Sequence, residues 1–341
     1  MRVKIILLII AAVFLTACSR DESDSDIIIS WNEDLNGYVV TKFHVESGEM
    51  VIPAEYKGYP VVGIYSVSGY NASSVVIPEG ITRILFSFTY PGNLKEVNLP
   101  DSAEWIHGSF AGSGITHINV SESSPHFTSI DGVLYNKDAT ELMVYPGGRK
   151  GEYIVPDGMK TIYHNSFVSS GNENMESIVL PKSWTPYESV AYEDDEVIEA
   201  AMYFNYFDRC SALESIQVHE DNEYFKTIDG VLFSKDMKYL LCYPDARKGE
   251  SYTVPEGVER IYSTFNNNEF LSEVFLPATI EQIDGDFEGV KRIYVDMDTA
   301  DFEYVQVQSW LKATGNFIFN DTDEITQTTH DPGLPNDPPP L

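Results

Sequence analysis

Short apolar runs recur along the chain at a nearly regular interval, and most of them end at a proline. The pattern apolar-x-x-apolar-x-apolar occurs at Leu94/Val97/Leu99, Met175/Ile178/Leu180 and Leu271/Val274/Leu276. Its last two positions have the two-residue spacing of one face of a short strand. An apolar residue stands directly before proline at Ile52-Pro53, Ile77-Pro78, Leu99-Pro100, Val155-Pro156, Leu180-Pro181, Val254-Pro255 and Leu276-Pro277. Several intervals between these pairs are 22 or 25 residues, which is within the period range of stacked repeats and predicts a solenoid with one such strand in each turn.

A second apolar landmark follows the prolines at a constant distance. Phe88, Phe110, Phe265 and Phe287 each stand ten residues after a repeat proline, and Phe167 stands eleven after. We therefore expect each of these turns to bury an aromatic side chain on the side opposite the strand.

A longer repeat is superimposed on the short one. The segment Phe127–Tyr135 returns later in the chain as Phe225–Phe233, and the match continues through Tyr145-Pro146 and Tyr243-Pro244. In each copy, strand-like runs flank a polar turn at Lys137-Asp138 or Lys235-Asp236. This arrangement predicts two inserted β-hairpins, at about 121–152 and 219–252.

These motifs together resemble the BspA-type leucine-rich repeats of bacterial surface proteins, over roughly residues 51–296. The resemblance rests on the LxxIxLP-type strand, the later phenylalanine and the Ile-Asp-Gly-Val-Leu-Tyr/Phe hairpin. It implies a leucine-rich-repeat solenoid of the α/β horseshoe class, here β-rich with few short helices, with inserted β-hairpins and terminal caps. It also implies a non-catalytic protein without cofactors that adheres to host matrix or to other bacteria.

Both ends of the array need caps, because a terminal coil otherwise exposes its core. Residues 27–50 predict an N-terminal hairpin and cap, with an Asn36-Gly37 turn. Residues 297–319 predict a C-terminal cap: a helix over 299–313 followed by a strand at Phe317–Phe319. The proline-rich residues 320–341 predict a disordered tail.

The first residues predict export and a lipid anchor. A short cationic start and an apolar run from Ile5 to Leu15 have the proportions of a signal peptide, here residues 1–17. The tetrad Leu15-Thr16-Ala17-Cys18 resembles the bacterial lipobox, in which the cysteine receives a diacylglyceryl group; an ordinary secretory peptide is the alternative. Cys18 is then the lipidation site, and residues 18–26 form an acidic tether. The protein is expected outside the cytoplasm, on the membrane of a one-membrane or two-membrane envelope.

Composition excludes several function classes. The 341 residues include 22 Lys+Arg and 53 Asp+Glu, a formal charge of -31, which disfavours binding to nucleic acid. The seven histidines show no metal-ligand spacing, and no phosphate loop or nucleophile elbow is present. The sequence therefore predicts no metal site and no catalytic residue. Cys210 and Cys242 occupy apolar repeat positions, which favours buried thiols over a disulfide between them.

One turn departs from the repeat. The connection from Pro181 to Phe207 is more than twice as long as the ten- or eleven-residue connection of other turns. The extra residues, about 185–203, include Glu193, Asp194, Asp195 and Glu196, and lack Lys and Arg. They form either a tolerated surface loop or an acidic, tyrosine-bearing contact site.

The remaining candidate is the face of the strands. Residues that alternate with the core positions should point outward, and they are Val76, Asn98, Asn119, Val179, Gln217, Phe275 and Tyr294. Amides together with aromatic and aliphatic side chains suit a protein or polysaccharide partner better than a small charged metabolite. The predicted function is a monomeric surface protein that binds such a partner. The alternatives are a structural or assembly partner within the envelope, and an extracytoplasmic hydrolase.

Overall fold

A computed structural model describes most of the repeat region. The described residues are 27–68, 71–88, 93–110, 114–163, 166–167, 174–186, 206–207, 210–262, 265, 268–307 and 316–321. The predicted signal peptide, Cys18, the tether, the acidic residues 193–196 and residues 322–341 lie outside them. The chain divides into two compact units. Unit 1 comprises Met1–Asp138 and Met143–Gly148, and unit 2 comprises Ala139–Leu142 and Arg149–Leu341.

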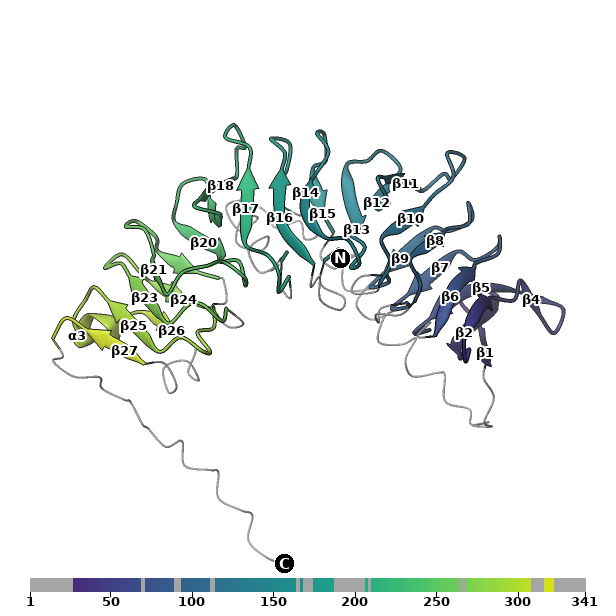
Figure 1. The fold of residues 1–341 in the computed structure, drawn as a ribbon, viewed down its shortest axis with the longest axis horizontal. Coiled ribbons are helices and arrows are strands. Elements are labelled where there is room, and N and C mark those ends of the chain that lie inside the picture. Colours follow the sequence, from purple (N-terminus) through teal and green to yellow (C-terminus); the bar gives the residue numbers. More distant parts are fainter. Residues whose placement is uncertain are drawn as a thin grey trace, which may run out of the picture. The chain divides into compact units, whose positions relative to one another are not determined.

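Unit 1 has two rows of strands (Figure 1). Its front row contains three strands that end near repeat prolines, β3 (Gly48–Val51), β6 (Ala72–Val76) and β8 (Glu96–Asn98), and then β10 (His117–Asn119). Its second row contains β5 (Tyr59–Tyr65), β7 (Arg83–Leu85) and β9 (Trp105–His107), which pair in parallel. The predicted N-terminal hairpin is confirmed: β1 (Ile27–Asn32) and β2 (Gly37–Phe43) are antiparallel, and β2 joins β5. The short β4 (Glu55–Tyr56) pairs with β5.

Unit 2 repeats the same arrangement. Its front row consists of β14 (Gly151–Ile154), β16 (Met175–Leu180) and β17 (Ser215–Val218), then β21 (Ser251–Thr253), β23 (Glu273–Leu276), β25 (Arg292–Val295) and β27 (Phe317–Phe319). In its second row, Glu141 and Leu142 of β13 (Glu141–Val144) pair with β15 (Thr161–Ile162). Further along, β20 (Tyr239–Cys242), β22 (Arg260–Ile261), β24 (Gln282–Ile283) and β26 (Gln306–Val307) pair in that order. The predicted β-rich solenoid is therefore confirmed in each unit.

Each insert begins with a hairpin that the sequence reasoning did not separate from the following turn. In unit 1, β11 (Phe127–Ile130) pairs with β12 (Val133–Asn136); in unit 2, β18 (Phe225–Ile228) pairs with β19 (Val231–Ser234). The first turn is an Asp-Gly pair with left-handed backbone, at φ 50° and 80° for Asp229 and Gly230. The predicted polar turn then connects β19 to the antiparallel β20. The second copy is thus a three-stranded meander, because its Asp-Gly pair adds a tight hairpin turn.

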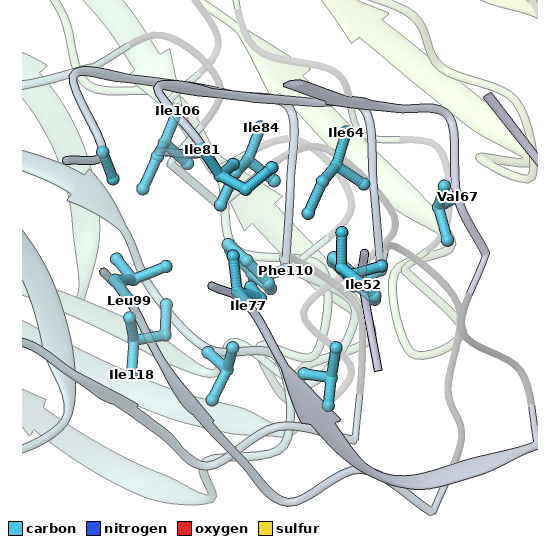
Figure 2. Close-up of a cluster of buried hydrophobic side chains, with 14 of the residues drawn as sticks. Ile52, Ile64, Val67, Ile77, Ile81, Ile84, Leu99, Ile106, Phe110 and Ile118 are labelled. Atoms are coloured by element: carbon cyan, nitrogen blue, oxygen red, sulfur yellow. The ribbon is translucent and has the colours of Figure 1, made fainter. Parts of the chain in front are cut away.

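The core of each turn lies between its two rows. In unit 1, Ile52, Ile77, Leu99 and Ile118 from the front row face Ile64, Ile84 and Ile106 from the second row, with Phe110 between them (Figure 2). All of these side chains are buried. Burial of each such aliphatic side chain stabilises the fold by about 1.5–3 kcal/mol.

The predicted aromatic position is confirmed. Phe88, Phe110, Phe167, Phe265 and Phe287 are all at most 4% exposed. The rings of Phe88 and Phe110 stack with centroids 5.4 Å apart, and those of Phe265 and Phe287 with centroids 4.8 Å apart. Since each ring packs on the ring of the next turn, this position sets the spacing of adjacent turns.

Buried serines also join the turns of unit 1. The Ser109 hydroxyl accepts from the Ser87 amide at 3.0 Å and donates to the Ile84 carbonyl at 3.1 Å. The Ser87 hydroxyl accepts from the Val67 amide in the same way, one turn earlier. These bonds tie the segments that follow β5, β7 and β9 to the backbone of the adjacent turn.

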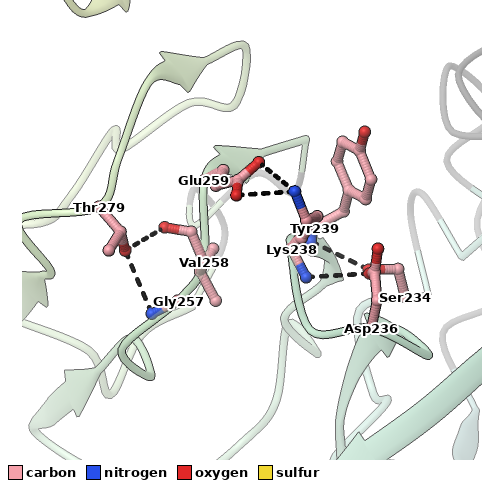
Figure 3. A network of polar contacts seen from close by, with 8 residues as sticks. All are labelled: Ser234, Asp236, Lys238, Tyr239, Gly257, Val258, Glu259 and Thr279. Carbon is pink, nitrogen blue, oxygen red and sulfur yellow. Dashed lines mark hydrogen bonds and ion pairs between the residues drawn. The ribbon is translucent and has the colours of Figure 1, made fainter.

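In unit 2, polar side chains connect the turns at the surface (Figure 3). The Thr279 hydroxyl accepts from the Gly257 amide and donates to the Val258 carbonyl, at 3.2 and 2.8 Å. The Lys238 ammonium lies 2.9 Å from the Glu259 carboxylate. Each contact joins residues about one turn apart, so it favours the stacked arrangement over separated turns.

The C-terminal cap differs from its prediction. The structure has a single helical turn, α3 (Thr299–Phe302), and then the strand β26, so the predicted helix is wrong between 303 and 307. The reason is that the Gln306 amide bonds to the Glu281 carbonyl, which extends the second row onto the cap. The predicted strand at Phe317–Phe319 and the burial of Phe302 and Val305 are confirmed. None of the described helical segments is long and apolar enough to span a bilayer.

Candidate binding surfaces on the strand rows

The front rows present every second side chain to solvent. In β8, Val97 is buried while Glu96 and Asn98 are exposed, and the buried Val75 of β6 and Ile216 of β17 likewise stand between less buried neighbours. Where neighbouring strands pair in parallel without a register change, equivalent positions of successive turns lie directly side by side. The outward residues therefore form rows that run from strand to strand.

In unit 1, the structure brings Asn98 and Asn119 together. They are register partners, and the Asn119 side-chain amide donates to the Asn98 side-chain carbonyl at 3.1 Å. Val76 is 42% exposed, and Val51, its register partner on β3, is 52% exposed. The front row of unit 1 is thus aliphatic on β3 and β6 and amide-bearing on β8 and β10.

In unit 2, Val179 and Gln217 are register partners on β16 and β17. The partner of Val179 on β14 is Ile154, which is 64% exposed. The sequence reasoning missed Ile154, although it lies directly before the core residue Val155. Because successive strand residues point to opposite faces, Ile154 is expected to point outward.

An aromatic pair lies on this surface in the C-terminal half of unit 2. Phe275 and Tyr294 are register partners, and their rings stack with centroids 4.6 Å apart and 7° between their planes. Thr253 precedes them in register on β21, and Ile318 follows on β27. We call Thr253, Phe275, Tyr294 and Ile318 the front ridge.

The charge beside the front ridge is locally balanced. Glu273 and Arg292 lie two residues before Phe275 and Tyr294 on the same strands, and they form an ion pair. Because the two residues are opposite in charge and adjacent, the ridge stands beside a neutral pair even though the chain as a whole is strongly acidic.

The described residues contain no group of three or more His, Cys, Asp or Glu placed to hold a metal ion. Cys210 and Cys242 are both buried thiols and form no disulfide with each other, as expected from their apolar positions. Cys18 and the acidic residues Glu193, Asp194, Asp195 and Glu196 lie outside the described residues.

Two aromatic surfaces were not anticipated. At the N-terminal hairpin, Trp31 packs edge to face against Tyr38 and Tyr59 at 5.1 and 5.3 Å, and Tyr38 contacts Tyr56. On the second row of unit 1, Trp105 and Phe86 are 51% and 43% exposed. The available signal was the position of Trp105 directly before the core residue Ile106, but the sequence reasoning considered only the front strands.

The family comparison agrees with the architecture. Residues 60–139 match the family model described as BspA type leucine rich repeat region, with six copies. A search of curated proteins found no match.

Solved structures of bacterial repeat proteins are similar to this chain at low identity. A leucine rich cell surface protein from Faecalibacterium prausnitzii is 16% identical, with 90% of this chain and 97% of that chain covered and a TM-score of 0.38. A leucine-rich repeat protein from Bacteroides ovatus is 15% identical, with 91% and 81% covered and a TM-score of 0.38. The pneumococcal vaccine antigen PcpA is 19% identical, with 80% and 68% covered and a TM-score of 0.33.

Proposed function

Because this chain carries BspA-type leucine-rich repeats, we propose that it is a non-catalytic binding protein of the bacterial cell surface whose front rows bind a protein partner. Leucine-rich repeats generally mediate protein interactions, and their stacked strands offer an extended surface for this purpose. Lipid attachment at Cys18 would hold the protein to the membrane, with residues 18–26 as the tether. Adhesion to host or bacterial surfaces is the role that such a protein would perform.

The front ridge is the observation that carries this proposal. A sugar ring packs against the open face of an aromatic ring, but the stacking of Phe275 on Tyr294, with centroids 4.6 Å apart, covers one face of each ring. Thr253 and Ile318 stand in register on either side of the pair. The ridge therefore presents ring edges and aliphatic groups, which complement the apolar centre of a protein interface. This geometry favours a protein over a polysaccharide at this position.

The unit 1 front row supports the same proposal. Asn98 and Asn119 are bonded to each other and retain further donor and acceptor capacity, since a side-chain amide can form up to four hydrogen bonds. Val51 and Val76 lie on the neighbouring strands of the row. A surface that combines exposed aliphatic groups with amides able to form further hydrogen bonds suits a polypeptide, which offers both apolar side chains and backbone polar groups.

Binding should be tested with the soluble form that starts at Ser19. We would immobilise it and offer purified matrix proteins, polysaccharides and an envelope extract of the producing bacterium. The variant Phe275→Ser/Tyr294→Ser should lose the partner, because both half-buried rings of the ridge are removed. Tyr304→Ser is the matched control, since Tyr304 is an aromatic residue of unit 2 that is 87% exposed and lies off the front row.

The outcomes separate the competing functions. Capture of a matrix protein or of a surface protein from another bacterium, with loss in the ridge variant, supports adhesion. Capture of only the bacterium's own envelope proteins would contradict adhesion and support an assembly role within the envelope. Polysaccharide binding that survives the ridge substitution, or hydrolysis of a polysaccharide, would contradict the proposal.

The anchor needs a separate test. In the producing bacterium, Cys18→Ser should abolish incorporation of labelled palmitate and move the protein from the membrane fraction to the soluble fraction. Label that remains on the Cys18→Ser protein would show that the lipid is attached elsewhere.

A further inference from the structure

The second row of unit 1 carries an exposed surface of its own, distinct from the front row. We define the β7–β9 patch as Tyr65, Arg83, Leu85, Phe86, Trp105 and His107. Its members are register neighbours: Arg83 pairs with Trp105, Leu85 with His107, and Tyr65 with Leu85. The strands β5, β7 and β9 that carry it follow one another in the row (Figure 1). Ile84 and Ile106 alternate with these residues and are buried, so the patch occupies the outward side of the sheet.

Trp105 is 51% exposed, more than the other exposed aromatic member of the patch, Phe86, at 43%. Trp31, by comparison, packs against Tyr38 and Tyr59, and Trp184 is fully buried. Among the described residues, no other aromatic ring packs on the Trp105 indole. An indole held on a strand and left half in water offers a large apolar contact area that the fold does not cover.

Phe86 is unfavourable for folding in two respects. It is 43% exposed, and its backbone is left-handed with φ 49°. The residues at the same place in the neighbouring turns, Ser66 and Gly108, have φ 60° and 58°, so the repeat imposes this conformation. The Phe86 ring lies on Gly108, where an added Cβ would come within 2.6 Å of it, and it contacts the His107 ring at 5.0 Å. A bulky residue is strongly disfavoured at such a position, where glycine or asparagine is usual. The core residues Phe88 and Phe110 also have left-handed backbone, at φ 58° and 69°, but they are buried, so the feature particular to Phe86 is its exposed ring.

Arg83 gives the strands of the patch a positive charge, and the exposed Glu104 directly precedes Trp105. None of the residues of β5, β7 or β9 is acidic, although the chain contains 53 Asp+Glu and 22 Lys+Arg. Arg83 is exposed and makes a side-chain hydrogen bond to Tyr65. Burial raises the pKa of Tyr65, while this neighbouring guanidinium opposes the rise. The Asp34 carboxylate adds to the rise, so the phenol stays neutral and does not cancel the charge of Arg83.

From this combination we propose that the β7–β9 patch binds an acidic, apolar segment of a protein partner, with a carboxylate on Arg83 and apolar side chains over Trp105 and Phe86. Tryptophan, tyrosine and arginine are the residues that most often dominate binding energy at protein interfaces. The planar guanidinium matches a carboxylate in two parallel hydrogen bonds. The proposal concerns a different row from the front ridge and does not depend on it.

The test is a selection from a displayed library of random dodecapeptides on the form that starts at Ser19. Binders to the double variant Arg83→Glu/Trp105→Ala are removed first. We expect the enriched peptides to combine Asp or Glu with aromatic or aliphatic residues. The dissociation constant of the best peptide should rise at least tenfold in Arg83→Glu and in Trp105→Ala. It should be unchanged in Phe275→Ser/Tyr294→Ser, which alters only the front ridge.

The proposal is overturned if no peptide is enriched, if the enriched peptides lack acidic residues, or if they bind the Arg83→Glu protein equally well. Alginate serves as the anionic polysaccharide probe, and binding of alginate in place of any peptide would also overturn it. Thermal melting of each variant checks the fold. Because Arg83 is exposed, Arg83→Glu keeps the test decisive even if Trp105→Ala unfolds. Arg83→Lys should recover only part of the affinity, since an ammonium cannot form the paired hydrogen bonds.

Discussion

The two copies of the inserted hairpin share a backbone and differ in how they are attached to the preceding turn. In both copies the Asp-Gly turn is left-handed, with φ 49° and 78° in the first and 50° and 80° in the second. In both, a lysine donates to a backbone carbonyl earlier in the chain at the same separation, from Lys137 to Glu122 and from Lys235 to Glu220. The backbone of the hairpin is therefore a property of the repeated segment itself.

The attachment is stronger in the second copy. There the buried Asn222 amide donates to the carbonyls of Trp184, Lys182 and Pro181, and its carbonyl accepts from the amides of Tyr224 and Phe225. The Trp184 ring also stacks on Phe225, with centroids 4.1 Å apart. In the first copy the counterpart of Asn222 is Ser124, whose hydroxyl accepts from the Phe127 amide at 3.4 Å. The second copy follows the turn that contains the long insert, and its side chains hold that turn in place.

The largest expected effect is at Trp184. Three residues after its repeat proline, Trp184 occupies the position that Ala103 occupies in the turn before the first copy. Trp184→Ala should lower the free energy of unfolding by about 3–5 kcal/mol, because it removes a fully buried ring and leaves a cavity. Chemical denaturation measures this.

The matched control is Trp184→Phe, which keeps a stacking ring on Phe225. It also removes an indole N–H that is buried without a hydrogen-bond partner among the described residues. We expect a cost of about 1.5 kcal/mol or less from the smaller volume change. Equal losses in the two variants would mean that the ring does not hold the second copy.

Asn222 should show the next largest effect. Asn222→Ala leaves several buried backbone groups without partners, and we expect a loss of about 3 kcal/mol, compared with about 1 kcal/mol for Ser124→Ala. Asn222→Ser converts the second copy to the residue of the first. A loss for Asn222→Ser as small as that for Ser124→Ala would show that the two attachments are equivalent after all.

Substitutions at Gly148 and Ala246 test the segment at the end of each inserted copy, where the chain rejoins the repeat turns. The amides of Gly148 and Ala246 bond to the carbonyls of Ile115 and Leu213, both at 2.8 Å. A Cβ on Gly148 would lie 2.4 Å from the Gly114 carbonyl oxygen, so Gly148→Ala should destabilise by about 1–3 kcal/mol. Ala246→Gly should cost only about 0.5–1 kcal/mol, from the greater freedom of glycine in the unfolded chain. Thermal melting of the two variants gives the comparison, and a harmless Gly148→Ala would contradict the tight approach.

The smallest effect concerns the turn before the third strand. Ala139 and Met237 both have positive φ, 55° and 68°. Ala139→Gly should stabilise by about 0.5 kcal/mol, since relief of the left-handed backbone exceeds the entropy lost by glycine. Met237→Gly should give no gain, because Met237 also packs against the core of unit 2. A shift in melting temperature of the same sign in both variants would indicate that this packing contributes nothing.

Much of the fold could be predicted because the same spacing of apolar residues, proline and phenylalanine recurs in many turns. The buried Phe88, Phe110 and Phe265 were located from their distance to a proline alone. The helix predicted over 299–313 was wrong between 303 and 307, because the spacing of Phe302 and Val305 suits a helix as well as a turn that leads into a strand. Only the neighbouring β24 distinguishes the two, by pairing with Gln306.

The candidate site was predictable in outline and not in detail. Alternation identified Phe275 and Tyr294 as outward residues, but their stacking depends on a register that brings the strands of two successive turns together. Trp105 and Arg83 were not linked by any local pattern, since they belong to different turns and meet only as partners of β9 and β7.

The sequence by itself determined the repeat, the inward and outward positions of the front strands, the duplicated hairpin and the acidic character of the chain. These follow from local periodicity and composition. The tertiary structure decided which outward residues lie side by side, which ring faces are covered, and which positions must adopt left-handed backbone. Those properties depend on contacts between successive turns. The sequence of one turn contains no local pattern that identifies its contacts with the next turn. The front ridge and the β7–β9 patch are therefore products of stacking, although every residue in them was present in the printed sequence.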